Sequence, residues 1–223
     1  MVQLTLFLLY NRFTQCDINR KISYALDELK LTYETKYLDF NKEEHKDLEY
    51  TKINPNGRIP TLIDHNNNDF VLWESNAILL YLIDRYDTEK RLTSTNAEEK
   101  YQIMQWLFFQ ASGQCPYFGE FYWFFARHPE NFPSAIERYR AETLRVFGVL
   151  ESVLSKKEWL VGNKMTIADL SFIPCNYLML CSLLKDDKDF DFERDFPAMA
   201  AWHAKLEAIP SVKNVFASIS LKH

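Results

Sequence analysis

The spacing of the apolar residues changes abruptly near residue 87. Before that point, short apolar runs typical of buried strands alternate with stretches in which apolar residues recur on one helical face. We expect strands over residues 3–9, 33–40, 59–63 and 70–73, and helices over 18–30, 43–50 and from residue 75 onward. The order β-α-β-α-β-β-α predicts an α/β domain over residues 1–87.

Beyond residue 87 the chain carries only helical periodicity. Helices are predicted over residues 97–126 (interrupted at Pro116), 134–155, 166–184, 196–208 and 211–219. Residues 88–96 are polar and aperiodic, so we expect a linker there. The sequence therefore predicts two domains, the second of them all-α and extending over residues 97–223.

The composition excludes several classes of function. The formal net charge is −5 and the basic residues are scattered, so we expect no nucleic-acid partner. The apolar runs 4–10 and 77–83 are far shorter than the ~20 residues that cross a bilayer, and no signal-peptide pattern is visible, so we expect no membrane partner. The four cysteines form no metal-ligand pattern with the five histidines, which favours a metal-free protein of the reducing cytoplasm.

Two motifs, one in each half, carry a family resemblance. The first is Asn54-Pro-Asn-Gly-Arg-Ile-Pro-Thr-Leu62 followed by Leu72-Trp-Glu-Ser-Asn-Ala-Ile78, which resembles the glutathione-binding signature of cytosolic glutathione transferases. The second is Trp159-Leu-Val-Gly-Asn-Lys-Met-Thr-Ile-Ala-Asp169, which is similar to that family's helix-capping motif. The resemblance covers essentially the whole chain. It implies a thioredoxin-like N-terminal domain followed by an all-α C-terminal domain.

Further segments resemble one subgroup of this family, the fungal nitrogen-regulator-like transferases and the related bacterial nu class. They are Leu38-Asp-Phe with Glu44-His45, Trp106-Leu-Phe-Phe-Gln-Ala-Ser-Gly113 and Ala135-Ile-Glu-Arg-Tyr139. The resemblance implies glutathione as co-substrate, a hydrophobic electrophile or a disulfide as second substrate, and a homodimer.

The resemblance also implies residues that hold glutathione, and their chemistry suits that ligand. Glu74 can pair with the γ-glutamyl ammonium, and Ser75 at a helix start can hold a carboxylate beside backbone N–H groups. Pro60 is expected to follow a cis peptide bond, so that the backbone of Ile59 pairs with the cysteinyl part of the ligand. His45, assisted by Arg58, is expected at the glycyl end.

Two structural alternatives stay open for these residues. Glu74 and Ser75 could serve only as a helix cap. His45 stands in a charged stretch and could be a solvated surface residue.

The residue that activates the thiol lies where the sequence departs from the subgroup. Counting back from residues 26–34 places Cys16 at the catalytic position, but Cys16-Asp17-Ile18 replaces the subgroup's Thr/Ala-Pro-Asn. The preceding loop is also longer than usual. The candidates are therefore Cys16, Asn19, Thr14, Asn11 and Tyr10.

Two mechanisms follow from these candidates. In the first, Thr14, Asn19 or Asn11 donates a hydrogen bond to the glutathione sulfur, which lowers the pKa of the thiol below its ordinary value of ~8.5. In the second, Cys16 is itself the nucleophile, because a helix N-terminus lowers a cysteine pKa, and it forms a mixed disulfide with glutathione as in the omega-like classes. An inert, half-buried Cys16 is the structural alternative.

The helical half is expected to supply the electrophile pocket and a folding motif. The resemblance places the aromatic cluster 117–125 at this pocket, with Tyr117, Phe121 and Arg138 as its candidate residues. Thr166 and Asp169 predict a capping box, which is a structural feature.

The expected function is a glutathione transferase of detoxification, with redox activity as a glutathione-dependent disulfide reductase or peroxidase beside it. One alternative is a cysteine-type thioltransferase that uses Cys16. The other is a non-catalytic, glutathione-binding regulatory protein.

Overall fold

The computed structural model describes residues 2–10 and 20–214, and residues 1, 11–19 and 215–223 lie outside the described part. The described residues divide into two compact units: one comprises those up to Leu92 together with residues 210–214, and the other extends from Thr93 to Ile209. The division falls within the stretch 88–96. The helix over 210–214 groups with the first unit and not with the helical half, and Pro210 lines a pocket there together with Leu31.

The first unit is built on a four-stranded sheet in the order β2-β1-β3-β4. Its strands are β1 (Leu4–Tyr10), β2 (Tyr33–Asp39), β3 (Thr61–Asp64) and β4 (Phe70–Trp73). β1 runs parallel to β2 and antiparallel to β3, and β3 runs antiparallel to β4. This mixed sheet confirms the expected thioredoxin-like architecture. β3 begins later than predicted because Pro60 has no N–H to donate to a strand ladder.

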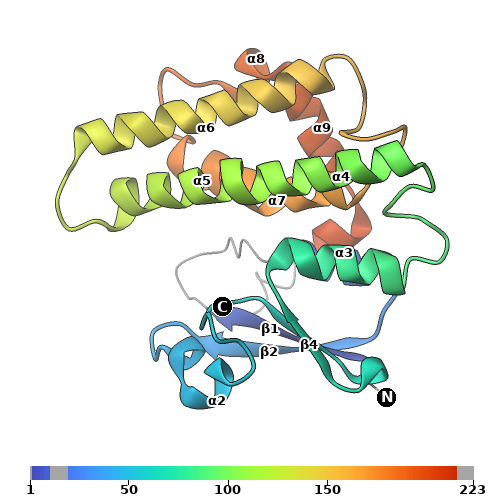
Figure 1. Cartoon of the computed structure of the whole chain (residues 1–223). Coiled ribbons are helices and arrows are strands. Elements are labelled where there is room, and N and C mark those ends of the chain that lie inside the picture. Colours follow the sequence, from blue (N-terminus) through green and yellow to red (C-terminus); the bar gives the residue numbers. More distant parts are fainter. Residues whose placement is uncertain (1, 11–19, 215–223) are drawn as a thin grey trace. The chain divides into compact units, whose positions relative to one another are not determined.

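Helices cover both faces of this sheet. They are α1 (Lys21–Glu28), η2 (Glu44–Lys46), α2 (Leu48–Thr51), η3 (His65–Asn67) and α3 (Ser75–Arg85). Figure 1 shows α3 on one side of the strands and α2 on the other. Ile22 and Leu26 of α1 and Ile78 and Leu82 of α3 are fully buried, which is the apolar face that their spacing predicted. The helix predicted over 43–50 is interrupted at Asp47, whose backbone is extended.

The second unit is a helical bundle. Its first arm runs through α4 (Ala97–Phe109), the π segment η4 (Gln110–Gln114), α5 (Cys115–Tyr122) and the π segment η5 (Trp123–Arg127). α6 (Pro133–Leu154) returns beside this arm, as Figure 1 shows in green and yellow. The remaining elements are α7 (Ile167–Leu178), the π segment η6 (Met179–Leu183), α8 (Phe192–Asp195) and α9 (Pro197–Glu207).

The helix break predicted at Pro116 is wrong, since the chain stays helical through this residue near the start of α5. A proline ring collides with the carbonyl four residues earlier in an α-helix, which here belongs to Ser112. Ser112 lies in η4, and the wider turn of a π segment removes that conflict.

The predicted capping box at the start of α7 is confirmed. Thr166 Oγ1 accepts a hydrogen bond from the Ala168 N–H, and Asp169 Oδ2 accepts one from the Thr166 N–H at 2.8 Å. Asp169 is completely buried, and its Oδ1 also accepts from the Leu160 N–H and the Trp202 indole N–H, each at 3.0 Å. This carboxylate therefore ties α7 to α9.

Candidate functional site

The strand register brings the site residues of the first unit to one end of the sheet. Tyr10, the last residue of β1, pairs with Asp39 at the end of β2. Thr61, the first residue of β3, pairs with Phe7 of β1 and with Trp73 at the end of β4. The ends of β1, β2 and β4 therefore lie at the same end of the sheet as the start of β3. The sequence motif 54–60 precedes β3 at this end, and the motif 74–75 follows β4.

A buried hydrogen-bond network holds the segment before β3. Tyr50 Oη donates to the Arg58 carbonyl at 2.7 Å and lies 2.8 Å from Thr61 Oγ1. Asn54 Nδ2 donates to the same carbonyl at 2.6 Å and to the same hydroxyl at 2.9 Å. The Ile59–Pro60 peptide bond lies between Arg58 and Thr61 in the chain, and it is cis as predicted. Tyr50 and Asn54 thus hold the residues before and after this bond, and with them the backbone of Ile59.

Glu74 occupies the turn between β4 and α3 in an unusual backbone conformation. Its φ is 72° and its ψ 111°, outside the regions that non-glycine residues prefer. Such conformations cost of order 1–3 kcal/mol and concentrate at ligand sites. Glu74 is the N-cap residue of α3, but its side chain is exposed and makes no capping hydrogen bond.

The start of α3 offers an anion site beside Glu74. Ser75 is the first residue of an 11-residue helix, and the first intrahelical bond runs from the Ile78 N–H to the Glu74 carbonyl. The N–H groups of the first turn, together with the helix dipole, favour a carboxylate at this point. The partly exposed Ser75 hydroxyl stands at the same place.

A buried lysine links the starts of α1 and α3. Lys21 is only 1% exposed, and its Nζ donates to Asn76 Oδ1 at 2.7 Å. Neither residue was singled out from the sequence. The available signal is a lysine at a helix start whose neighbour Ile22 belongs to the buried face.

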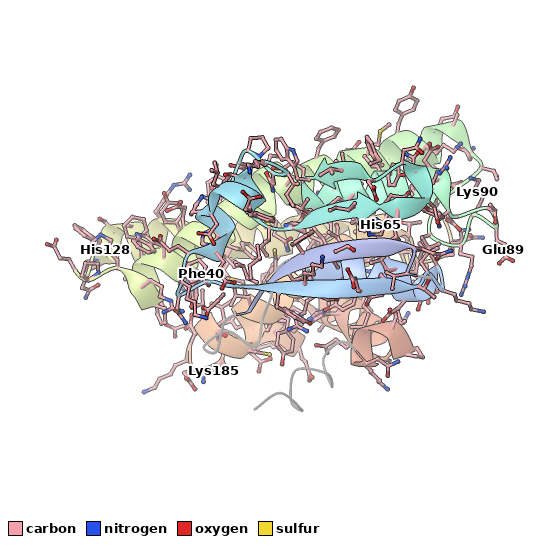
Figure 2. The ribbon with its side chains drawn as sticks, turned by 90° about the horizontal axis from the view of Figure 1, so that it is seen from below. Phe40, His65, Glu89, Lys90, His128 and Lys185 are labelled. Atoms are coloured by element: carbon pink, nitrogen blue, oxygen red, sulfur yellow. The ribbon has the colours of Figure 1, made fainter. Side chains whose placement is uncertain are left out.

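His45 is buried, not a solvated surface residue, so that alternative is wrong. It is 8% exposed and its ring stacks on Phe40 with centroids 5.3 Å apart. Phe40 follows β2 and is labelled in Figure 2. Burial lowers the pKa of His45 below its usual value, and neighbouring Lys46 adds to this effect. Nδ1 has no hydrogen-bond partner within the described part of the chain.

The candidate catalytic residues Cys16, Asn19, Thr14 and Asn11 lie outside the described residues. The backbone of Tyr10 ends β1 at the site end of the sheet, and its side chain is not described. Arg58 is exposed beside the network that holds Ile59.

The helical unit carries the predicted pocket residues on α5 and α6. Tyr117 is half-buried and lies 6.3 Å from the Tyr139 ring, whereas Phe121 is 1% exposed and belongs to the core. Arg138 is exposed and pairs with Glu142 at 2.6 Å. Figure 2 shows His128 at the far end of the hairpin between α5 and α6.

Two further observations concern cofactors and membranes. Across residues 2–10 and 20–214, no group of three His, Cys, Asp or Glu side chains is placed to hold a metal ion. Every helix in that same part is too short or too polar to cross a bilayer.

Comparison with family models and with known proteins relates both units to one family. Residues 8–84 match the model "Glutathione S-transferase, N-terminal domain", and residues 115–210 match "Glutathione S-transferase, C-terminal domain". The chain is 48% identical to glutathione S-transferase 1 of Schizosaccharomyces pombe over 204 residues, which is 88% of this chain and 89% of that protein.

Two solved structures from Phanerochaete chrysosporium are similar along their whole length. One is the glutathione transferase URE2P6 in complex with oxidized glutathione, with a TM-score of 0.91, 50% identity and coverage of 98% and 97% of the two chains. The other is Ure2p5 cocrystallized with 1-(S-glutathionyl)-2,4-dinitrobenzene, with a TM-score of 0.89, 47% identity and coverage of 100% and 96%.

Proposed function

The chain belongs to the glutathione S-transferase family, with fungal Ure2p-type transferases among its relatives, and on that premise we propose that it activates the thiol of glutathione for attack on hydrophobic electrophiles. The observation that carries this proposal is the meeting of the Ile59 backbone, Glu74 and the start of α3 at one end of the sheet. A small peptide with one ammonium and two carboxylates needs these complementary groups within its own length.

Each part of glutathione has a partner of matching chemistry at this site. The γ-glutamyl ammonium pairs with Glu74, and the adjacent α-carboxylate accepts from Ser75 and the first N–H groups of α3. The cysteinyl backbone pairs with the N–H and C=O of Ile59. The glycyl carboxylate lies toward His45 and Arg58, and it supplies the partner that the buried Nδ1 of His45 lacks among the described residues.

Activation of the thiol falls to the segment that follows β1. A hydroxyl or amide donor there, from Thr14 or Asn19, stabilises the glutathione thiolate, which then attacks the electrophile. If Cys16 is the nucleophile, it exchanges with a glutathione disulfide and the enzyme is a thioltransferase. The complex of URE2P6 with oxidized glutathione supports glutathione-dependent disulfide reductase or peroxidase activity as an accompanying reaction.

The electrophile site is assigned to the helical unit, as the family resemblance implies. Half-buried Tyr117 and exposed Arg138 provide its surface, and the fully buried Phe121 supports it from the core. The dinitrophenyl conjugate held by Ure2p5 supports an aromatic, hydrophobic second substrate.

We also infer that the protein is a cytoplasmic homodimer that acts in detoxification. Large apolar side chains are exposed in both units: Phe70 (42%), Trp73 (37%), Tyr101 (70%) and Phe108 (70%). Exposed apolar groups of this size are typical of interaction surfaces. Light scattering at micromolar concentration tests the dimer, and a mass of one chain contradicts it.

The primary test measures glutathione binding and turnover together. We expect retention on immobilised glutathione, a thermal shift with millimolar glutathione, and conjugation of 1-chloro-2,4-dinitrobenzene. Glu74→Gln is expected to weaken all three. Glu89→Gln is the matched control, because Glu89 is an exposed glutamate of the same unit and is labelled at the edge of the molecule in Figure 2. Wild-type protein that neither binds nor shifts contradicts the proposal.

A second test separates the two mechanisms. Cys16→Ala is assayed with chlorodinitrobenzene and with hydroxyethyl disulfide. Loss of the disulfide reaction alone identifies Cys16 as the nucleophile, whereas unchanged rates assign activation to a hydrogen-bond donor. Glutathione binding without either activity supports the regulatory alternative.

A further inference from the structure

Two cysteines of the helical unit lie in contact although 60 residues separate them in the sequence. Cys115 begins α5 and Cys175 lies within α7, and their sulfur atoms are 3.1 Å apart. Both carry thiols in this structure. A disulfide bond is ~2.05 Å long, so the two sulfurs are within about 1 Å of bonding distance.

The two sulfurs differ in their access to solvent. Cys175 is 1% exposed, whereas Cys115 is only half-buried. A small oxidant in solution therefore reaches Cys115 first. Cys175 stands behind it as the group that can resolve an oxidised Cys115.

The amide of Gln110 contacts both sulfurs and belongs to a chain of buried amide side chains. Gln110 Nε2 lies 3.1 Å from Cys115 Sγ and 3.6 Å from Cys175 Sγ. The same amide donates to Gln114 Oε1, and Gln114 Nε2 donates to Asn176 Oδ1 at 2.8 Å. Hydrogen bonds donated to sulfur favour the thiolate, which is the reactive form of cysteine. The network thus holds both sulfurs in place and solvates a developing negative charge.

We propose that Cys115 and Cys175 form an oxidisable dithiol that closes to an intrachain disulfide on reaction with a hydroperoxide. Cys115 sulfur attacks the O–O bond, so that an S–O bond forms, the alcohol or water leaves, and a sulfenic acid results. Cys175 sulfur then attacks the sulfenic sulfur, the S–S bond forms, and water leaves. In total two thiols lose two electrons and two protons, and ROOH becomes ROH and water.

Reduction returns the pair to its starting state. One glutathione thiolate attacks the disulfide to give a mixed disulfide, and a second releases glutathione disulfide and restores both thiols. Both cysteines belong to the helical unit, so the proposal stands without the glutathione site of the first unit.

The test is a peptide map of the full-length protein after hydrogen peroxide treatment. Remaining thiols are alkylated before digestion without reductant. Trypsin leaves Cys115 in peptide 101–127 and leaves Cys175 and Cys181 together in peptide 165–185. Cys181→Ser removes this ambiguity, and it is a mild change because Cys181 is exposed.

We expect the two peptides to be joined, with a mass two hydrogens below their sum, in the wild type and in Cys181→Ser. The joined species should disappear on incubation with millimolar glutathione, and it should be absent from Cys115→Ser and Cys175→Ser. Recovery of both peptides alkylated, a disulfide between two chains, or over-oxidised Cys115 without linkage each overturns the proposal. The result in Cys181→Ser decides the matter even where a serine at the buried position 175 impairs folding.

Discussion

The ammonium of Lys21 lies 2.7 Å from the side-chain oxygen of Asn76, and this contact joins the start of α1 to the start of α3. The lysine is almost completely buried, so its charge relies on polar partners and not on water. Asn76 directly follows Ser75. The contact therefore fixes the helix start at which we place the carboxylate of glutathione.

Asn76→Ala is expected to lower the free energy of unfolding by about 2 kcal/mol, because a buried charged donor loses one acceptor. It should also weaken glutathione binding. Asn76→Asp keeps an acceptor for Lys21 and should retain most of the stability. Urea unfolding and calorimetric titration measure the two effects, with exposed Asn163→Ala as control. Equal behaviour of Asn76→Ala and the control contradicts this role.

Tyr50→Phe tests the network that holds the Ile59 backbone. The substitution leaves the Arg58 carbonyl and the Thr61 hydroxyl without the Tyr50 partner, at a cost of about 1–3 kcal/mol. We expect a higher Kd for glutathione in calorimetry as well. Tyr101→Phe, at a residue that is 70% exposed, should change neither quantity. A Tyr50→Phe protein with reduced stability but unaltered Kd would limit the network to folding.

Glu74→Gly is expected to move stability and binding in opposite directions. Glycine accepts a φ of 72° without strain, so the free energy of unfolding should rise by about 1 kcal/mol after the entropic cost of glycine. Glutathione affinity should fall by about tenfold, because the ammonium loses its carboxylate partner. Thermal unfolding and calorimetry are the measurements. A glycine variant that binds glutathione as well as the wild type shows that Glu74 has no role in binding.

His203 makes the helical unit sensitive to acid. Burial lowers its pKa from 6.5 to about 4. The unfolded chain takes up this proton near pH 6.5, and the folded chain only near pH 4. Stability therefore falls as the pH drops through this window, by about 2 kcal/mol at pH 5.

Urea unfolding at pH 7.5 and pH 5 measures this loss of stability. In His203→Gln the decrease in the free energy of unfolding between the two pH values should be smaller by about 2 kcal/mol. Glu207 lies 3.7 Å from His203, and burial raises its pKa. Glu207 changes the stability in the opposite direction, because the folded chain takes up the Glu207 proton at a higher pH than the unfolded chain does. Glu207→Gln isolates the histidine, and an unchanged pH dependence in His203→Gln is the contrary result.

Much of the fold could be predicted from the sequence because its elements carry clear periodicity. The strand over 70–73 and the helix start at Ser75 were predicted at their observed positions, and the capping box of Thr166 was predicted from four consecutive residues. The π segments could not be predicted, since one wider turn hardly changes the spacing of apolar residues. Pro116 was therefore interpreted as a break.

The candidate site was predicted in part. Glu74, Ser75 and Pro60 lie in contiguous motifs, whereas Lys21 and Tyr50 contribute through contacts with residues distant in sequence. His45 stands among charged residues in the sequence, whereas in the structure it is buried and stacks on Phe40. Contacts of this kind depend on the packing of separate elements, which a single sequence does not display.

The π segment η4 has a consequence for how chains of this kind change length. A π turn contains one residue more than an α turn, while the helices on either side still direct the same side chains toward the core. Loss of a single residue among Ala111, Ser112 and Gly113 would leave a regular α-helix with α4 and α5 still in place. The same deletion inside α4 would rotate everything beyond it by about 100°. Insertions and deletions in this arm are therefore expected to accumulate at η4 during divergence.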